Sequence, residues 1–172
     1  MNLGGSLTCR INMNLREKHG YTYYSRGYFL GDKYPGPYTV FTSVRADVTD
    51  SSVIQIMKEI RNYADKGITE KELQETKMAT AQRETQLYET PSQKAAVLKN
   101  ILDYGLEKDF TLKQSEILKS LTVAEINELA KKYLPYDKMH IVVVGDKVKV
   151  FDKLKKIGYE VVELDANRDM VK

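Results

Sequence analysis

The residues best suited to chemistry lie in one short stretch near the N-terminus. Arg16 lies in the last turn of a predicted helix, and Tyr23 lies at the start of the strand that follows Gly20. A guanidinium presents a fixed fork of hydrogen-bond donors to a peptide carbonyl or a carboxylate, and a phenol can donate to an oxygen that gains negative charge. Because both side chains can project toward one edge of a sheet, the pair suits peptide recognition.

A purely structural interpretation of the same two residues stays open. Cations are often found at helix C-termini, where Arg16 would interact with unpaired carbonyls. Tyr23 is one of twelve tyrosines in the chain, and tyrosine packs well on a sheet without any further role. Spacing alone favours the structural interpretation.

Other motifs offer little chemistry. The two histidines, His19 and His140, lie far apart, and neither has a second histidine or a cysteine at metal-ligand spacing. The sequence contains no His-Glu-x-x-His motif, no inverted form of it, no glycine-rich phosphate loop and no Gly-x-Ser-x-Gly turn. We interpret Cys9, the only cysteine, as a small core residue and His140 as part of a buried strand. The sequence therefore predicts no metal site and no catalytic nucleophile.

Charge and length restrict the class of protein further. The 172 residues include 27 basic and 24 acidic side chains, a net charge of +3, and the two signs are interleaved along the predicted helices. This pattern lacks the basic face of a nucleic-acid-binding protein. The apolar runs are far shorter than the ~20 residues of a membrane span. We expect one domain over residues 1–172, with a core that folds without metals or disulfides.

Two elements are predicted to position the Arg16 and Tyr23 segment. A helix that ends near Gly20 is predicted from apolar residues at a spacing of four, namely Leu7, Ile11 and Leu15. Residues 21–30 and 38–46 are rich in aromatic and β-branched side chains, and the turn-forming residues 31–37 separate them. This pattern predicts an antiparallel hairpin.

A helical block is predicted after the hairpin. Thr49 or Asp50 caps a helix that ends at Gly67, with a buried face composed of Val53, Met57, Ile60 and Ala64. Thr69 and Glu72 then have the form of a capping box, in which each side chain satisfies an unpaired backbone N–H at the start of the next helix.

Three further helical segments are predicted. Thr90-Pro91 marks a start and Gly105 an end, and the buried face is predicted to comprise Ala95, Leu98, Ile101 and Leu102. A short helix covers residues 110–121, and a second capping box, Thr122 with Glu125, opens the last helix of this block.

The C-terminal part is predicted to return to the sheet. Residues 140–144 form a short, continuous, β-branched run, which is typical of a central strand covered on both faces. A helix around Phe151 that ends at Gly158 and a strand over residues 159–164 follow, and the tail after Asp165 is expected to fray. The predicted fold class is α+β, with helices packed on a mostly antiparallel sheet.

Several short motifs together resemble a known family. They follow one another along nearly the whole chain: Leu3-Gly4-Gly5, the run from Asn14 to Tyr23, Val44-Arg45-Ala46-Asp47-Val48-Thr49, Gly67-Ile68-Thr69 before Glu72-Leu73, and Val143-Val144-Gly145-Asp146. In this order and spacing they resemble the C-terminal half of the pitrilysin, or insulinase-like, zinc metallopeptidases, which include mitochondrial processing peptidase.

The resemblance implies a division of roles between two homologous α+β domains. In that family the N-terminal domain holds zinc through an inverted His-x-x-Glu-His motif and a distal glutamate, whereas the C-terminal domain has no metal site and closes over the substrate. By implication, Arg16 would hold a substrate carbonyl. Tyr23 would help bind the peptide or stabilise the oxyanion of the tetrahedral intermediate.

We therefore expect the substrate-binding, active-site-closing domain of a zinc metalloendopeptidase, as a C-terminal fragment of a longer peptidase. No cofactor is expected in this chain, zinc is expected in a partner domain in cis or in trans, and the other partner is a peptide substrate. The isolated chain is predicted to be inactive. The alternative is a non-catalytic structural or assembly module of the same family. A nucleic-acid binder is disfavoured because both charges mix on one helix, at Lys58, Glu59, Arg61, Asp65 and Lys66.

Overall fold

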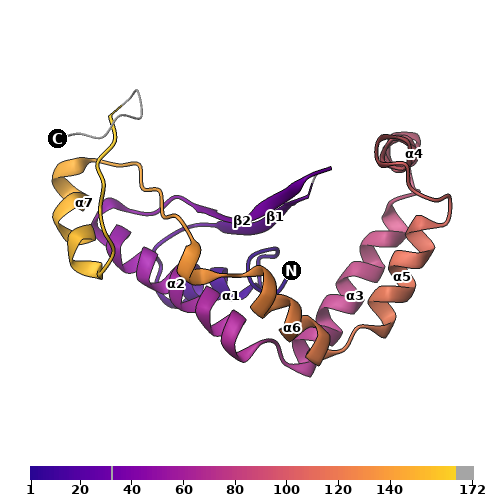
Figure 1. Ribbon diagram of the computed structural model, residues 1–172, viewed down its shortest axis with the longest axis horizontal. Helices are drawn as coiled ribbons and strands as arrows, with labels where there is room; N and C mark the ends of the chain where they lie inside the picture. Colours follow the sequence, from indigo (N-terminus) through magenta and orange to yellow (C-terminus); the bar gives the residue numbers. More distant parts are fainter. Residues whose placement is uncertain (32, 166–172) are drawn as a thin grey trace.

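The computed structural model describes residues 1–31 and 33–165, and their fold has the shape of an open V (Figure 1). One limb is a body in which helices support a β-hairpin. The other limb is an arm of helices that projects away from the body (Figure 1).

The described residues form seven α-helices, four short helical turns and a two-stranded sheet. The α-helices are α1 (Arg10–Asn12), α2 (Thr49–Lys66), α3 (Glu70–Gln86), α4 (Pro91–Tyr104), α5 (Phe110–Ser120), α6 (Val123–Tyr133) and α7 (Lys147–Leu154). The other elements are a π-helix η1 (Met13–Lys18), the 3₁₀ turns η2 (Ala46–Val48), η3 (Tyr136–Lys138) and η4 (Lys155–Ile157), and the strands β1 (Ser25–Gly31) and β2 (Pro35–Thr42). The α+β class predicted from the sequence is confirmed.

The first predicted helix forms, but later and in a different geometry than expected. It begins at Arg10, because turns occupy the preceding residues, and it continues as a π-helix in which the His19 N–H donates to the Asn14 carbonyl at 3.1 Å. The prediction that Leu7 lies in this helix is wrong, since Leu7 is exposed and precedes the helix. Ile11 and Leu15 lie in the helical segment, and both are fully buried.

The predicted hairpin is confirmed, with shorter strands. β1 and β2 pair antiparallel, with Ser25 opposite Thr42. The hairpin rests on the N-terminal segment, where the Gly27 N–H donates to the Gly4 carbonyl at 2.8 Å. A Cβ at Gly4 would lie 2.5 Å from the Gly27 Cα, so only glycine allows the two backbones to approach this closely.

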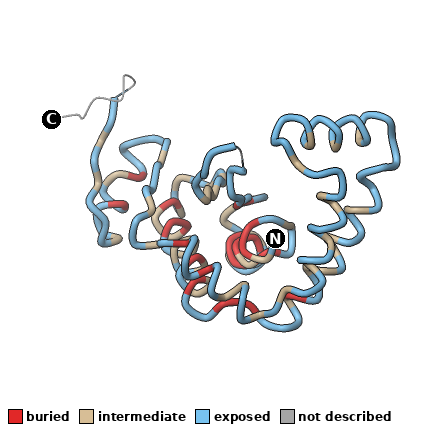
Figure 2. The backbone as a smooth tube through the Cα atoms, turned by 45° about the vertical axis from the view of Figure 1, so that its right-hand side comes forward, coloured by how far each residue is buried: buried red, intermediate tan, exposed pale blue. Residues whose placement is uncertain are grey.

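The core of the body joins segments from both ends of the chain. Its buried members are Leu3, Cys9, Ile11, Leu15, Ile60, Ala64, Ala130 and Leu134. A second, smaller cluster consists of Val53, Val150 and Leu154, where α7 packs on α2. The predicted interpretation of Cys9 as a core residue is confirmed, and the predicted buried face of α2 holds at Val53, Ile60 and Ala64. Figure 2 shows the buried residues concentrated in this limb.

The predicted helices of the arm form, but the side chains predicted to be buried on α4 are not buried. α3 and α5 pack side by side, and α4 lies at the far end of the arm (Figure 1). The predicted buried face of α4, namely Ala95, Leu98, Ile101 and Leu102, is wrong, because no residue of α4 is buried and the exposed fraction of Leu102 reaches 80%. An apolar stripe becomes buried only where another element covers it, and none of the described elements covers α4.

The prediction of two C-terminal strands is also wrong. Residues 140–144 belong to no helix or sheet among the described residues, and Val142 and Val144 are 84% and 96% exposed. His140, expected in a buried strand, is exposed. Residues 159–164 form no strand either, apart from an isolated bridge at its last residue. A β-branched run becomes a strand only when a second backbone pairs with it. The tail after Asp165 lies outside the described residues.

Candidate functional site

Arg16 and Tyr23 lie together, although they belong to different elements. The Arg16 Cζ is 5.1 Å from the centre of the Tyr23 ring, a cation–π distance. The Arg16 Nε also lies 3.3 Å from the Glu17 Oε1. Tyr23 is 85% exposed, so its phenol is open to solvent, and the Arg16 side chain is 36% exposed. The arrangement offers two kinds of donor, one charged and one neutral, at one surface position.

The end of η1 creates this proximity. Gly20 adopts a φ of +63°, and its N–H donates to the Arg16 carbonyl at 3.0 Å. The Tyr21 N–H then donates to the Leu15 carbonyl at 2.8 Å, which turns the chain back beside the helix. A residue with a Cβ is strained at such a φ, so the glycine that ended the predicted helix also directs Tyr23 toward Arg16.

Side chains from two neighbouring segments hold the turn in place. The Thr22 hydroxyl donates to the Ser43 carbonyl at 2.7 Å, and the Tyr24 N–H donates to the Thr22 Oγ1 at 3.1 Å. The Arg45 Nη1 donates to the Gly20 carbonyl at 3.0 Å. Sequence reasoning missed these roles for Thr22 and Arg45, because the partners lie more than twenty residues away in the chain.

An open, shallow depression lies next to Tyr23. It is lined by residues 20–23 on one side and by residues 43–45 on the other. The described residues give no backbone partner to the N–H groups of Thr22, Tyr23, Val44 and Arg45. Unpaired backbone N–H groups of this kind can donate hydrogen bonds to an extended peptide backbone.

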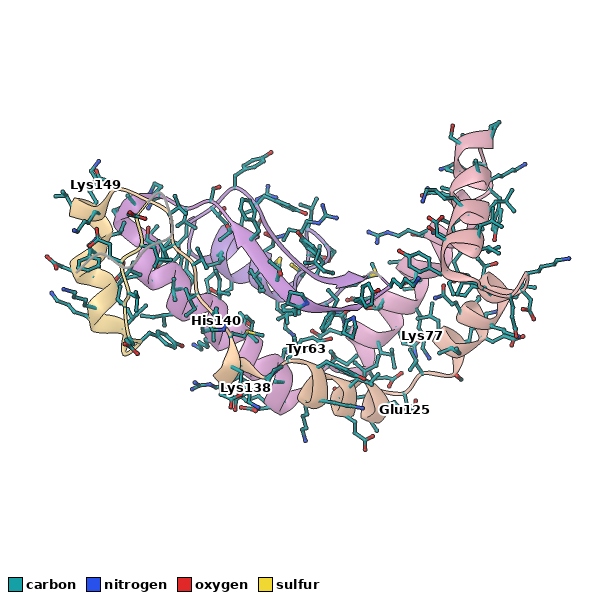
Figure 3. All side chains as sticks on the ribbon, turned by 45° about the horizontal axis from the view of Figure 1, so that its top comes forward. Tyr63, Lys77, Glu125, Lys138, His140 and Lys149 are labelled. Atoms are coloured by element: carbon teal, nitrogen blue, oxygen red, sulfur yellow. The ribbon has the colours of Figure 1, made fainter. Side chains whose placement is uncertain are left out.

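His19 lies beside this turn without a role in metal binding. Its ring stacks on that of Tyr21, with the ring centres 4.9 Å apart. Its Nε2 is enclosed and has no hydrogen-bond partner among the described residues. His140 lies on the stretch between α6 and α7 (Figure 3). Neither histidine belongs to a metal-binding group among the described residues.

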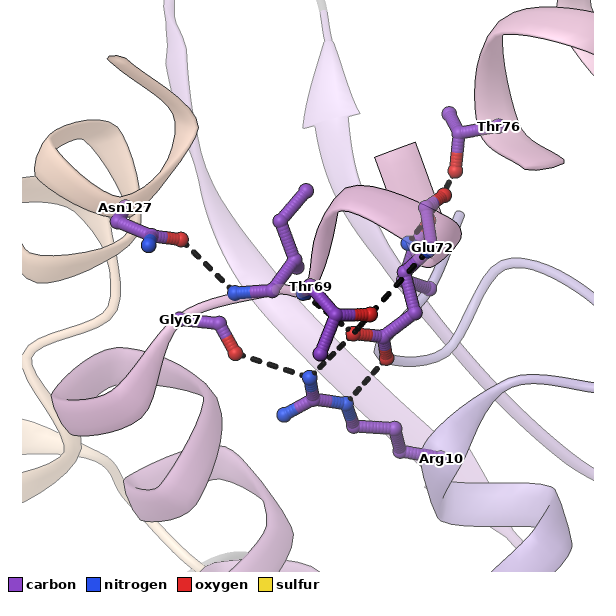
Figure 4. Close-up of polar contacts among 8 residues, drawn as sticks. Arg10, Gly67, Thr69, Glu72, Thr76 and Asn127 are labelled. Atoms are coloured by element: carbon purple, nitrogen blue, oxygen red, sulfur yellow. Dashed lines mark hydrogen bonds and ion pairs between the residues drawn. The ribbon is translucent and has the colours of Figure 1, made fainter. Parts of the chain in front are cut away.

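A second polar cluster fastens the arm to the body (Figure 4). The Arg10 Nε and Nη2 each lie 2.7 Å from one oxygen of the Glu72 carboxylate, and Nη2 also donates to the Gly67 carbonyl at 2.9 Å. Glu72 accepts from the Thr69 N–H at 2.8 Å, which confirms the predicted capping box. The Arg10 guanidinium, assisted by the Thr69 donors, lowers the pKa of the Glu72 carboxyl to about 2.

Sequence reasoning found Thr69 and Glu72 but missed Arg10. The neighbouring Gly67 has a φ of +70°, and a Cβ there would meet the Asn127 side chain at 2.0 Å. Asn127 in turn accepts from the Ile68 N–H at 2.8 Å. The hydrogen bonds of this cluster join α1 to the start of α3 and to Gly67, so we assign it to stability.

Metal ligands do not gather anywhere in residues 1–31 and 33–165. No group of three or more histidine, cysteine, aspartate or glutamate side chains there could hold a metal ion. A search of the described helices for a segment long and apolar enough to cross a membrane finds none.

Comparisons with known proteins point to one family. Residues 1–80 match the family described as the peptidase M16 inactive domain. The fold is similar to the crystal structure of a peptidase M16 inactive domain from Pseudomonas fluorescens, with a TM-score of 0.73 and 25% identity over 80% of this chain and 33% of that chain. No curated protein matches the sequence significantly.

A second solved structure shares the fold. A protease from Helicobacter pylori is similar with a TM-score of 0.64 and 15% identity, over 76% of this chain and 31% of that chain. This chain therefore spans about a third of the length of the solved chains that it matches.

Proposed function

We propose that this chain, which belongs to the peptidase M16 family as an inactive domain, binds a peptide substrate and closes over the active site of a zinc-bearing partner domain. The observation that carries the proposal is the Arg16–Tyr23 pair, 5.1 Å apart beside an open depression with unpaired backbone N–H groups. The partner domain lies in the same polypeptide or in another subunit.

Arg16 provides charged hydrogen-bond donors that bind and orient the peptide substrate. Its guanidinium stacks on one aromatic face, and its remaining N–H groups donate to a carbonyl of the bound peptide. This interaction is equally strong in the ground state and the transition state, so it acts on substrate affinity. Losing a hydrogen bond from a charged donor costs about 1.5–3 kcal/mol, or roughly 10- to 150-fold in affinity.

Tyr23 supplies a neutral donor at the reacting carbonyl. Its exposed phenol donates to the oxyanion that forms when the carbonyl is attacked. Because that charge is absent in the ground state, the interaction acts on the rate of the chemical step. Loss of one oxyanion donor typically lowers kcat about 10²- to 10³-fold.

Zinc does not fit the described residues of this chain, which offer no set of three metal-ligating side chains. The metal and the attacking water therefore belong to the partner domain. The isolated chain is expected to cleave no peptide.

Reconstitution with a zinc-binding M16 domain from the same polypeptide or operon tests the proposal. Cleavage of an unfolded fluorogenic peptide is measured with the wild-type chain, with Arg16→Ala and with Tyr23→Phe. A matched control exists on the hairpin, where the Arg26 Cζ lies 5.3 Å from the Tyr28 ring centre. Arg26→Ala and Tyr28→Phe remove the same groups from another stacked pair.

The two substitutions are expected to differ in kind. Arg16→Ala should raise KM, Tyr23→Phe should lower kcat, and both control substitutions should leave both constants unchanged. Restored cleavage that is indifferent to Arg16 and Tyr23 would refute the proposal and favour the alternative, a structural or assembly module of the family.

A further inference from the structure

One peptide unit, between Gly20 and Tyr21, sets the direction in which the chain leaves η1. Its carbonyl accepts a hydrogen bond from the Arg45 Nη1 at 3.0 Å, and its N–H donates to the Leu15 carbonyl at 2.8 Å. Because a peptide unit is planar, hydrogen bonds at both of its ends fix its orientation. Tyr23 lies two residues beyond this unit, so the position of its phenol depends on both bonds.

Gly20 does not fix this direction by itself. Its φ of +63° lies in the left-handed region, and glycine has access to more backbone conformations than any other residue. The Leu15 carbonyl belongs to the same helix, so it restrains only the start of the turn. Restraint from outside the turn comes from the Arg45 guanidinium and from the Ser43 carbonyl, which accepts from the Thr22 hydroxyl at 2.7 Å. The direction of the turn is therefore set by a neighbouring segment.

Arg45 is itself held in place, although 61% of its side chain is exposed. Its Nε lies 3.2 Å from the Asp47 Oδ1, and the Asp47 carbonyl accepts from the Lys153 Nζ of α7 at 2.8 Å. A guanidinium that is fixed by a second partner loses less side-chain freedom when it binds the carbonyl. A line of contacts therefore runs from α7 through Asp47 and Arg45 to the Gly20 carbonyl.

Arg45 is too exposed to act through stability alone. An exposed ion pair such as that of Arg45 with Asp47 contributes little to the free energy of unfolding. Arg45 also lines the depression beside Tyr23, where the proposed function places the substrate. The contacts of this arginine therefore act on the geometry of the site.

We infer that Arg45 is a positioning residue, which places the Tyr23 phenol for the oxyanion by holding the Gly20 carbonyl. In this role it acts through the turn and makes no contact with the reacting carbonyl. Arg16 belongs to η1, upstream of the turn, so its position does not depend on this bond. The inference rests on the proposed function, because it identifies what sets the geometry of the neutral donor named there.

Amide hydrogen exchange in the chain alone tests the positioning without any partner. The probe is the Tyr21 N–H, which belongs to the held peptide unit. Arg45→Ala should raise its exchange rate about fivefold, because the turn opens more often when one of the two bonds is lost. The thermal midpoint and the exchange of Ile60 in α2 should not change, because Ile60 belongs to the core and Arg45 does not.

Cleavage by the reconstituted complex tests the consequence for catalysis. Arg45→Ala should lower kcat about tenfold and leave KM within about twofold, because the turn carries the oxyanion donor and not the Arg16 guanidinium. In a Tyr23→Phe background, where that donor is absent, Arg45→Ala should lower kcat by less than about twofold. A residue that acted only through stability would lower activity equally in both backgrounds.

Two further variants serve as controls. Arg45→Lys keeps a cationic donor for the Gly20 carbonyl but lacks the guanidinium fork that also contacts Asp47, so its kcat should lie between those of the wild type and Arg45→Ala. Lys77→Ala removes a cation that donates to another backbone carbonyl, that of Lys119, on the arm (Figure 3). This control should leave kcat and KM unchanged.

The outcomes separate this inference from the proposed function. Unchanged exchange at Tyr21 in Arg45→Ala would overturn the inference and leave the function intact. An equal loss of kcat in the wild-type and Tyr23→Phe backgrounds would also overturn it. Faster exchange at Tyr21, together with a complex whose kcat is the same with Tyr23→Phe as with the wild type, would refute the function while supporting the placement of the turn by Arg45.

Discussion

The helices of the body and of the arm begin with similar capping residues, yet the two limbs differ in how far their apolar side chains are buried. In the body, α1, η1, α2 and α6 bury a core drawn from residues 3 to 134. In the arm, α4 and α5 contain no buried residue. The helix starts do not explain the difference, because Thr90 in the arm and Thr122 in the body have the same capping box.

This contrast separates two sources of stability. A capping box and a regular apolar period are local properties, and both limbs have them. Burial depends on a second element that reaches the apolar face, and among the described residues no such element covers α4. The arm is therefore expected to open locally while the body stays folded.

Truncation of an apolar side chain in each limb should give the largest difference. Leu15→Ala removes a fully buried side chain and should lower the free energy of unfolding by about 2–5 kcal/mol. Leu102→Ala removes the same group from a side chain that is 80% exposed and should change it by less than about 0.5 kcal/mol. Urea denaturation measures both. Equal losses of unfolding free energy in the two variants would show that α4 is covered in solution and that the body and the arm do not differ in burial.

The junction between the limbs should give an intermediate effect. Glu72→Gln removes the charge that Arg10 faces, and it should lower the free energy of unfolding by about 1–3 kcal/mol at neutral pH. Because the pKa of Glu72 falls from 4.5 to about 2 on folding, its contribution is present above pH 4.5 and is lost as the pH falls toward 2.

The pH profile supplies the check. Acid denaturation of Glu72→Gln should show a clearly smaller slope of stability between pH 4.5 and 2 than the wild type, whereas Glu125→Gln should reduce this slope much less. Glu125 has the same position in its capping box but no arginine partner among the contacts that the described residues make. A wild-type slope in Glu72→Gln would contradict the assignment.

Removal of a cap should have a smaller effect, and one confined to its limb. Thr90→Ala should raise the amide exchange rate of α4 about fivefold, the equivalent of roughly 1 kcal/mol, and leave α2 unchanged. Thr122→Ala, the same substitution in α6, should instead raise exchange in both α6 and α2, which pack together. Faster exchange in α2 after Thr90→Ala would mean that the arm and the body open as one unit.

The smallest effect is expected on the outer surface of the arm. Lys99 pairs with Asp103 one turn away on α4, and both side chains are largely solvated. Lys99→Ala should leave the thermal midpoint unchanged within error, because exposed pairs of this kind contribute little. A clear drop would indicate that this pair is enclosed by a contact in solution.

The same contrast explains which parts of the fold could be predicted from sequence. The starts at Thr69 and Thr122 were predictable, because a capping box needs only residues three positions apart. The start at Thr90 was predictable because a proline follows it at the first helical position. The faces of α4 and the state of residues 140–144 were not, because each depends on a covering or pairing element that the described residues do not provide. In both cases the apolar pattern was identified correctly and its burial was not.

The candidate site divides in the same way. Arg16 and Tyr23 are only seven positions apart across a glycine turn, so their proximity could be anticipated. The residues that support the turn and the junction could not, since Arg45 reaches back 25 positions to Gly20 and Arg10 reaches forward 62 positions to Glu72. Neither arginine belongs to a local sequence motif from which its partner could be identified.

The composition of the first core cluster has a consequence for synthesis on the ribosome. Leu3, Ile11 and Leu15 are synthesised more than a hundred residues before their partners Ala130 and Leu134. At about 5–20 residues per second, the N-terminal segment waits on the order of ten seconds with its apolar side chains uncovered. Chaperones that bind nascent chains therefore have a defined interval and a defined target, residues 3–15, during translation of this protein.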